Sequence, residues 1–349
     1  MAELEKAKSS VMKKSKNHEL GSQVKGYDFN EGIDYEGLLG SFSSMGIQAT
    51  ELAKGVDLVN KMLNWKENDP DQGNERGCKI FLGYTSNMVS SGCRELIKFL
   101  AEHKLVDVIV TTAGGIEEDF IKCLAPSHIG SFKVDDHQLR EEGLNRIGNM
   151  LVPNQNYCLF EDWLNPLLDE IYEEQTRNNK IWSPSQIIDF LGNKIDHKDS
   201  IYYWCHKNEI PVFCPALTDG SMGDMIFFHS YRKPGLIIDI VEDIRRLNKS
   251  AMSAMKTGAV ILGGGLVKHH IFNANLMRNG LDFTVLINTA IEYDASDAGA
   301  TPQEAISWGK ISGEGNFVKI FGEASIIFPL IISRSFAKFH HKSLKRVTP

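Results

Sequence analysis

The spacing of apolar positions changes character along the chain. Residues 1–25 are rich in Lys and Ser and have little periodicity, which predicts a mobile arm with a short helix over residues 3–14. Residues 66–77 are polar and predict a loop. Between arm and loop, apolar residues recur at a spacing that predicts helices. They are Leu38, Phe42, Met45, Ile47, Leu52, Val56, Val59 and Leu63.

Beyond residue 78, short apolar runs alternate with helical patterns. Strands are predicted at 79–82, 106–110, 211–213, 259–262, 283–287 and 317–321. Helices are predicted at 92–103, 236–248 and 267–277, with a final one from Ala324. This alternation is typical of a mainly parallel sheet with helices on both faces. The prediction is one doubly wound, Rossmann-like α/β domain with helical additions, over residues 26–349.

Ligands of such domains bind beyond the carboxyl ends of the strands. The chemistry is therefore expected in the loops at those ends, several of which are unusually polar or rich in glycine. They span residues 85–92, 111–119, 218–224, 263–270 and 294–309.

Two of these loops have the composition of phosphate-binding turns. Gly263, Gly264 and Gly265 separate a predicted strand from a helix, and Thr112 precedes a similar turn. Glycines there let backbone N–H groups approach a phosphate. Neither turn has the GxGxxG spacing, so a tight strand-to-helix connection explains each of them equally well.

Acidic residues are the second feature of the loops. A single loop carboxylate usually caps a helix or faces water. Several that converge would repel one another unless a cation joined them, and a polyamine would suit such a cluster. The acidic residues are Glu117, Glu118, Asp219, Asp224, Asp294, Asp297 and Glu304.

Two basic side chains are candidates for catalysis. His269, in the first turn of a predicted helix, could act as a general base or make an ordinary polar contact. Lys310 follows Trp308 and Gly309, where partial desolvation would leave its amine neutral and nucleophilic. A surface lysine with its stem on the indole is the alternative.

Composition narrows the class of protein. The formal net charge of -7 disfavours nucleic acid as a partner. The six cysteines include no CxxC pair, and no metal-ligand spacing occurs, so no metal site is predicted. No apolar run has the length of a membrane span or the character of a secretion signal. The expectation is a reduced, soluble, cytoplasmic protein.

Read together, the loop motifs resemble the deoxyhypusine synthase family over about residues 37–339. The similarity rests on several long and chemically unusual strings. They are Tyr84-Thr85-Ser86-Asn87, Val108-Ile109-Val110-Thr111-Thr112-Ala113-Gly114-Gly115, Asn145-Arg146-Ile147-Gly148-Asn149, Pro215-Ala216-Leu217-Thr218-Asp219-Gly220-Ser221, Leu262-Gly263-Gly264-Gly265 with Lys268-His269-His270, and Ile306-Ser307-Trp308-Gly309-Lys310.

The resemblance implies an NAD-dependent transferase whose single catalytic domain follows the arm. In this family spermidine is oxidised by NAD, and its 4-aminobutyl group passes through an imine on the catalytic lysine, here Lys310. The group ends on a lysine of the translation factor 5A precursor. The resemblance also implies a homotetramer with active sites between subunits, and no nucleic-acid or membrane partner.

The same resemblance assigns roles to individual positions. His269 is the expected base. Spermidine would contact Asn273, Trp308, Asp224, Asp297 and Glu304. NAD would contact Ser86, Asn87, Thr112, Glu118, Asp219, Gly264, Thr289, Asp294 and Glu323.

Two departures and two related functions qualify these expectations. Ala298 replaces the family's usual serine and Glu323 its usual aspartate. The lost hydroxyl would remove one hydrogen bond, worth ~1 kcal/mol. Homospermidine synthase, which uses putrescine as acceptor, keeps the same residues and is not separated from this reading. An inactive paralogue acting as an activating subunit is disfavoured because Lys310, His269 and Asn273 are all present.

Overall fold

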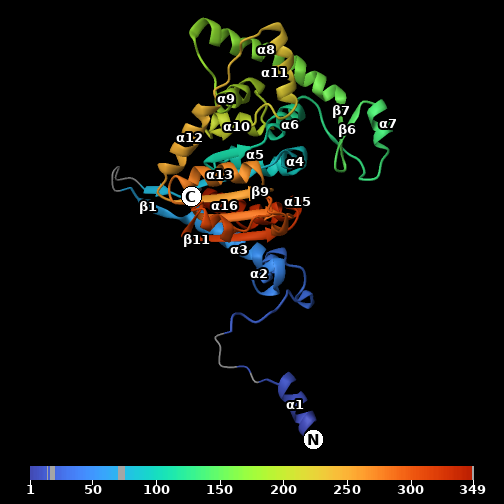
Figure 1. Ribbon diagram of the computed structural model, residues 1–349, viewed down its shortest axis with the longest axis vertical. Coiled ribbons are helices and arrows are strands. Elements are labelled where there is room, and N and C mark those ends of the chain that lie inside the picture. The colour runs from blue at the N-terminus through green and yellow to red at the C-terminus, as the bar shows by residue number, and fades with distance from the viewer. Residues whose placement is uncertain (14, 16–19, 70–74, 348–349) are drawn as a thin grey trace.

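The computed structural model describes residues 1–13, 15, 20–69 and 75–347. Its centre is a six-stranded sheet in the order β11-β10-β9-β3-β4-β8, in which every neighbouring pair is parallel (Figure 1). The strands are β3 (Lys79–Tyr84), β4 (Val108–Thr111), β8 (Val212–Phe213), β9 (Thr257–Leu262), β10 (Leu281–Asn288) and β11 (Ile311–Phe321). The predicted doubly wound α/β class is confirmed.

Helices cover both faces of this sheet because successive strand residues point to opposite sides. Leu82 and Val260 belong to the core under α3 (Ile47–Asn64), α5 (Cys93–Glu102) and α15 (Ala324–Arg334). Phe81 and Ile261, their chain neighbours, belong to the core under α12 (Ile240–Met252) and α13 (Leu266–Leu276). Strands that are apolar on both faces are what a two-sided parallel sheet requires.

Residues 126–235 build a region for which the apolar pattern predicted almost no elements. Its long helices gather at one end of the molecule, away from α2 and α1 (Figure 1). It contains α8 (Asn154–Asn178), α9 (Pro184–Ile195), α10 (Ile201–Lys207), α11 (Ser221–Arg232), and a small antiparallel sheet of β5 (His128–Ile129), β6 (Leu144–Ile147) and β7 (Met150–Pro153) beside α7 (Asp136–Glu141). The motif at 145–149 forms the β6–β7 hairpin of that sheet.

Several predicted loops contain regular structure. Residues 85–92 include α4 (Ser86–Ser90), and α6 (Ala113–Leu124) begins within 111–119. The segment 294–309 contains α14 (Pro302–Ser307) after η2 (Glu292–Asp294). The predicted 66–77 loop pairs its two ends as β1 (Lys66–Asn68) and β2 (Glu75–Gly77), while residues 70–74 of that prediction lie outside the described residues. At the chain end, α16 (Phe336–Val347) follows α15.

The N-terminal segment does contain a short helix, α1 (Ala2–Val11), and none of its residues is buried. Lys14 and residues 16–19 of the predicted arm lie outside the described residues. The packed chain resumes with η1 (Phe29–Glu31) and α2 (Tyr35–Met45). Helices were predicted here from the apolar spacing, and α2 packs against α3.

Asp119, at the end of a loop where chemistry was expected, is instead a structural residue of α6. Its carboxylate is fully buried and accepts hydrogen bonds from Arg94 Nε (2.7 Å), Ser200 Oγ (2.6 Å) and the Ile201 backbone N–H. Arg94 is itself 5% exposed, so removing the carboxylate would leave a buried guanidinium whose remaining carboxylate partner, Glu95, lies at 3.7 Å.

We expect Asp119→Ala to lower the free energy of unfolding by ~3–5 kcal/mol. The exposed Asp199, which pairs with Lys98 at 3.1 Å, is a matched control, and Asp199→Ala should cost below ~1 kcal/mol. Urea unfolding midpoints at constant m-value measure both changes. Equal effects of the two substitutions would contradict a structural role for Asp119.

Candidate active site

The parallel sheet brings most of the predicted cofactor residues to one edge. Ser86 and Asn87 begin α4 after β3, and Thr112 precedes α6 after β4. On the other half of the sheet, Thr289 follows β10 and Glu323 precedes α15. Residues from strands far apart in sequence thus share the carboxyl edge, next to helix N-termini that favour anionic groups.

Two glycines allow close packing at this edge. A Cβ on Gly114 would lie 2.6 Å from Ser86 Cβ, and one on Gly264 would lie 2.4 Å from Ala298 Cα. Gly264 therefore lets the segment after β10 approach the β9–α13 turn. This contact is a structural reason for glycine in a turn that the sequence explained equally well as a phosphate-binding turn or as a tight connection.

The edge also contains buried polar atoms without a protein partner. Thr112 Oγ1 and Glu118 Oε2 have no hydrogen-bond partner among the described residues. The other Glu118 oxygen accepts from the Tyr157 hydroxyl at 3.2 Å, and burial raises the pKa of the Glu118 carboxyl. A buried polar atom left unpaired is costly, so these two atoms fit a site for a polar ligand.

Lys310 lies in a separate cavity of about 260 Å³. Its walls come from α13, the segment after β10, α14 and the start of β11. The lining residues are Lys268, His269, Phe272, Ala295, Asp297, Ala300, Thr301, Glu304, Ala305, Trp308 and Lys310. Five residues predicted from the sequence to act together therefore share one cavity.

The position of Lys310 corrects the expectation that the chemistry lies only at the carboxyl ends of the strands. Lys310 immediately precedes β11, and its carbonyl accepts from the N–H of Leu281, the first residue of β10. It thus lies at the amino edge of the sheet. The segment 289–310 runs from the carboxyl edge to this edge, and α13 runs the same way, so the cavity extends along α13 between the two edges.

His269 and Asn273 are one helical turn apart on α13. The Asn273 amide nitrogen lies 3.0 Å from His269 Nδ1. An amide nitrogen only donates, so in this orientation Nδ1 accepts and neutral His269 carries its proton on Nε2. Turning the amide by 180° would place Oδ1 there, fix the proton on Nδ1 and leave Nε2 free as a base.

Asp297 offers an unpaired carboxylate oxygen at the cavity. Its Oδ2 is buried and has no hydrogen-bond partner among the described residues. Glu304, on α14, is exposed. Lys310 Nζ lies 5.7 Å from the centre of the Trp308 ring, and Trp308 is 65% exposed. The cavity thus combines an amine, an imidazole, two carboxylates and an open aromatic surface.

Lys268 was not predicted as a site residue, although it lines the cavity. It is 2% exposed and donates to the carbonyls of Asp297 and of Ala300, the latter at 3.2 Å. Burial lowers the pKa of its amine. The sequence could have indicated the burial of Lys268, because residue 268 lies on the same face of the helix as buried Ile271 and Phe272.

Asp224 and Asp219 do not line the Lys310 cavity of the same chain. Asp224 is an exposed residue in the first turn of α11, where Glu117 Oε2 accepts from the Met222 N–H at 2.7 Å. Burial raises the pKa of Glu117, and the charges of Asp224 and Asp219 raise it further. The predicted acidic residues therefore form two separate groups within one chain.

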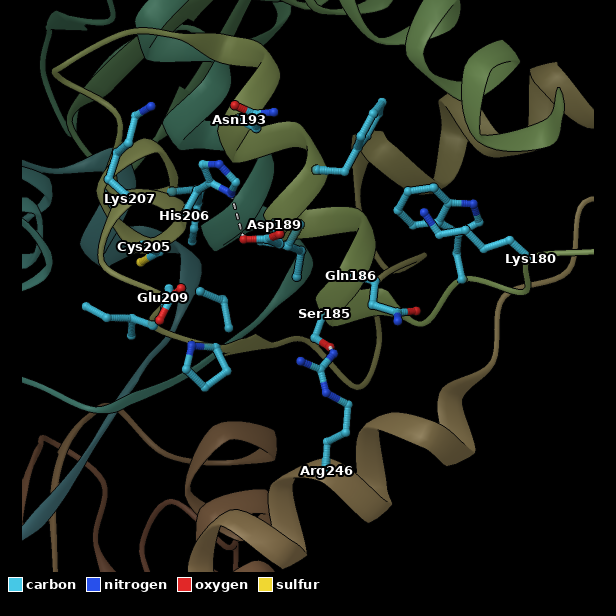
Figure 2. Close-up of a pocket in the computed structure, with 17 residues that line it drawn as sticks. Lys180, Ser185, Gln186, Asp189, Asn193, Cys205, His206, Lys207, Glu209 and Arg246 are labelled. Carbon is cyan, nitrogen blue, oxygen red and sulfur yellow. Dashed lines mark hydrogen bonds and ion pairs between the residues drawn. The ribbon is translucent and has the colours of Figure 1, made fainter. Parts of the chain in front are cut away.

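A larger cavity, of about 850 Å³, lies elsewhere and contains none of the predicted site residues. Figure 2 shows Arg246 extending toward Ser185 and His206 bonded to Asp189, at 2.9 Å. Cys205 also lines this cavity, but burial raises its pKa well above the ordinary value. A protonated thiol is a poor nucleophile, so the Cys205–His206 pair does not form a catalytic dyad.

Within the described part of the chain, no group of three or more His, Cys, Asp or Glu side chains is arranged to hold a metal ion. Over the same residues, no helix has both the length and the apolar character needed to cross a membrane.

Comparison with known proteins identifies the class. The family model for deoxyhypusine synthase matches residues 37–335. A Drosophila melanogaster protein named "Probable deoxyhypusine synthase" is 56% identical, over 98% of this chain and 97% of its own length. The deoxyhypusine synthase of Senecio vernalis is 51% identical, over 97% and 96%. A crystal structure from Entamoeba histolytica, assigned as a deoxyhypusine synthase, aligns with a TM-score of 0.65 and 35% identity over 90% of this chain and 97% of that one.

These matches define a transferase of hypusine biosynthesis. The chain belongs to the deoxyhypusine synthase family. The resemblance inferred from the loop motifs is confirmed, and the homospermidine synthase alternative is not favoured.

Proposed function

We propose that this chain transfers the 4-aminobutyl group of spermidine to a lysine of the translation factor 5A precursor, with NAD as cofactor, in the cytoplasm. The observation that carries the proposal is the cavity that places Lys310 beside His269 and Trp308, with Asp297 and Glu304 in its walls. An amine nucleophile, a base and two carboxylates are the groups that a reaction at a polyamine carbon requires.

The residues at the carboxyl edge fit NAD. The unpaired Thr112 Oγ1 and Glu118 Oε2 are available for polar contacts with the cofactor. Gly264 would contact the cofactor through its backbone. Ser86, Asn87, Asp219, Thr289, Asp294 and Glu323 complete the proposed cofactor contacts. When bound, NAD supplies a hydride acceptor and later returns the same hydride.

The substrate would lie along the cavity with its hydrocarbon stem on the indole of Trp308. Asp297 Oδ2 has no protein partner and is available to an ammonium group, and Glu304 offers a second anchor. Asn273 contributes by orienting His269. Because carboxylate–ammonium contacts strengthen as water leaves, the arrangement selects a dication of matching length.

Lys310 would carry the group between donor and acceptor. His269 accepts the proton that spermidine's secondary amine loses as its carbon is oxidised. The Lys310 amine adds to the resulting imine, the carbon–nitrogen bond to 1,3-diaminopropane breaks, and the butyl chain remains on Nζ as an imine. The acceptor lysine displaces Lys310 in the same way, and the new imine is then reduced.

We further propose a homotetramer in which each site lies between two subunits. Asp224 is a proposed substrate ligand, yet in one chain it lies outside the Lys310 cavity. Trp308 is exposed, and so are large apolar side chains on α11 and α12. The latter include Phe227, Phe228, Tyr231, Val241 and Ile244. Apolar surface of this extent is typical of an interface between subunits.

Mixing two inactive variants tests this arrangement. Asp224→Ala and Lys310→Ala should each be inactive alone, but a mixed dimer would hold one intact site built from the two unaltered residues. Random re-association at equal amounts should restore about a quarter of wild-type activity. Lys310→Ala mixed with His269→Ala is the control: both residues line one cavity, so every mixed site stays damaged. No recovery in the first mixture would rule out shared sites.

The division into an arm and a catalytic domain is also a proposal. It is supported by α1, which buries none of its residues, and by a family match that starts only at residue 37. Residues 1–25 would form the arm and residues 26–349 the NAD-binding catalytic domain.

The proposed acceptor is tested by competition. With NAD and labelled spermidine, label should enter the translation factor precursor. Putrescine added at an equal concentration should accept only a small share of the label. Label recovered mainly as homospermidine would assign the chain to the putrescine reaction instead. An absence of transfer to both acceptors would point to the inactive-paralogue alternative.

A further inference from the structure

The segment 289–301 carries much of the proposed site but has little regular structure of its own. It includes Thr289, Asp294 and Asp297, and its only helical turn is η2. Residues 291–296 are exposed, so the outer side of the segment faces solvent. Its inner side, however, is held by two lysines from different elements.

Lys268 reaches the segment from α13. Its ammonium group donates to the carbonyls of Asp297 and Ala300, and the side chain is 2% exposed. Lys319 reaches it from β11 and donates to the carbonyls of Ala290 (2.9 Å) and Gly299 (2.7 Å). Among the described residues, no carboxylate lies within ion-pair distance of either ammonium group, although the charge of Asp297 acts on Lys268 and that of Glu292 on Lys319.

This arrangement is unusual for Lys268, which is buried, while Lys319 is partly buried. A buried ammonium normally pairs with a carboxylate, because desolvation of an unpaired charge is costly. Here four backbone carbonyls of one segment accept the hydrogen bonds of the two amines, so these contacts last only while the segment keeps its shape. Burial lowers the pKa of both amines. At Lys268 the charge of Asp297 opposes this shift and the charge of Lys319 adds to it, and at Lys319 the charge of Glu292 opposes it.

The segment also fits closely where it is held. A Cβ on Gly299 would lie 1.9 Å from the Ile291 carbonyl oxygen, so the segment folds back on itself. The Asp297 carbonyl is taken by Lys268, while its carboxylate Oδ2 has no partner among the described residues. One residue is therefore fixed through its backbone and presents its side chain to the cavity.

We propose that Lys268 and Lys319 are positioning residues: together they clamp segment 289–301 in the shape that presents Asp297 to the substrate. Neither takes part in the covalent steps. Lys268 lines the cavity, and its fixed charge beside Asp297 also sets how deeply a substrate ammonium can enter. The effect on spermidine rests on the function proposed above, whereas the effect on the segment does not.

The test compares Lys268→Met and Lys319→Met with a matched control. Lys79 is also a partly buried lysine that donates to a backbone carbonyl, that of Ser250 at 3.0 Å, far from the segment in the fold. Methionine keeps the length of the stem and removes the charge and the donors. Lys268→Arg keeps charge and donors and should rescue part of the loss.

Two readouts are measured on the full-length protein. Hydrogen exchange of the amides in 289–301 should be at least about tenfold faster in both clamp variants and unchanged in Lys79→Met. The kcat/KM for spermidine should fall about 10- to 100-fold, mainly through KM, as expected for a misplaced substrate contact. The double variant should lose less than the product of the single losses, because both lysines hold one segment.

Unchanged exchange in the segment would overturn the clamp, whether or not the protein is a transferase. Faster exchange with an unchanged KM for spermidine would overturn the positioning of Asp297. If Lys268→Met fails to fold, Lys319→Met and Lys268→Arg still test the clamp, because both variants keep a cation at residue 268. If the wild type lacks transferase activity, the proposed function is wrong. The hydrogen exchange of residues 289–301 still tests the clamp in that case.

Discussion

Lys310→Ala is expected to lower the rate of aminobutyl transfer by ~10³-fold or more, the scale of losing a covalent nucleophile. The backbone of Lys310 is held on both sides, because its N–H donates to the Ala305 carbonyl (2.9 Å) and its carbonyl accepts from Leu281 (3.0 Å). Gly309 precedes it at φ 71°, which turns the chain into β11. The nucleophile is therefore placed by rigid neighbours, and truncation removes it without disturbing them.

Lys310→Arg separates covalent chemistry from charge. Arginine keeps the cation near Trp308 but stays protonated and does not form an imine with the substrate. Both variants should retain the wild-type unfolding midpoint and lose transfer, measured as label incorporated into the acceptor. Transfer by Lys310→Arg at more than about a tenth of the wild-type rate would contradict a covalent role.

His269→Ala is expected to slow the oxidation of spermidine by ~10²- to 10⁴-fold, the usual contribution of a general base. The base must have a free Nε2, which requires the Asn273 amide oxygen to accept from Nδ1–H. Asn273→Leu removes the amide that orients His269, and it should slow the same oxidation step by a smaller factor than His269→Ala does. The absorbance of reduced cofactor in a single turnover measures the step directly.

The two catalytic variants should differ in which step they block. His269→Ala should slow the appearance of reduced cofactor, whereas Lys310→Ala should permit the first oxidation and prevent the capture of its product. If His269→Ala leaves the single-turnover oxidation rate unchanged, another group is the base.

The central sheet was predictable because its strands are apolar on both faces. Every predicted strand was found. β3 and β9 extend beyond their predictions, to Tyr84 and from Thr257, whereas β4 and β8 begin one or two residues later than predicted. The region 126–235 was largely missed because its pattern is less regular. In α8 a proline, Pro166, lies inside a long and mostly polar helix.

The candidate site could be assembled from sequence only through the family motifs. Spacing alone could not show that Lys310 lies at the amino edge, because that depends on a crossing segment with no regular pattern. It also could not separate Asp119, which is structural, from Glu118, which has a buried oxygen without a partner. Burial and partners distinguish such neighbours, and both arise from tertiary contacts.

The most direct measurement of the central claim is to identify the residue that carries the substrate. Wild-type protein would be incubated with NAD and labelled spermidine without acceptor, reduced with borohydride, digested and analysed by mass spectrometry. The account predicts one labelled lysine, Lys310, with the mass of a 4-aminobutyl group, and no label when NAD is omitted. Label on another residue, such as Lys268, or none at all in the presence of NAD, would contradict it.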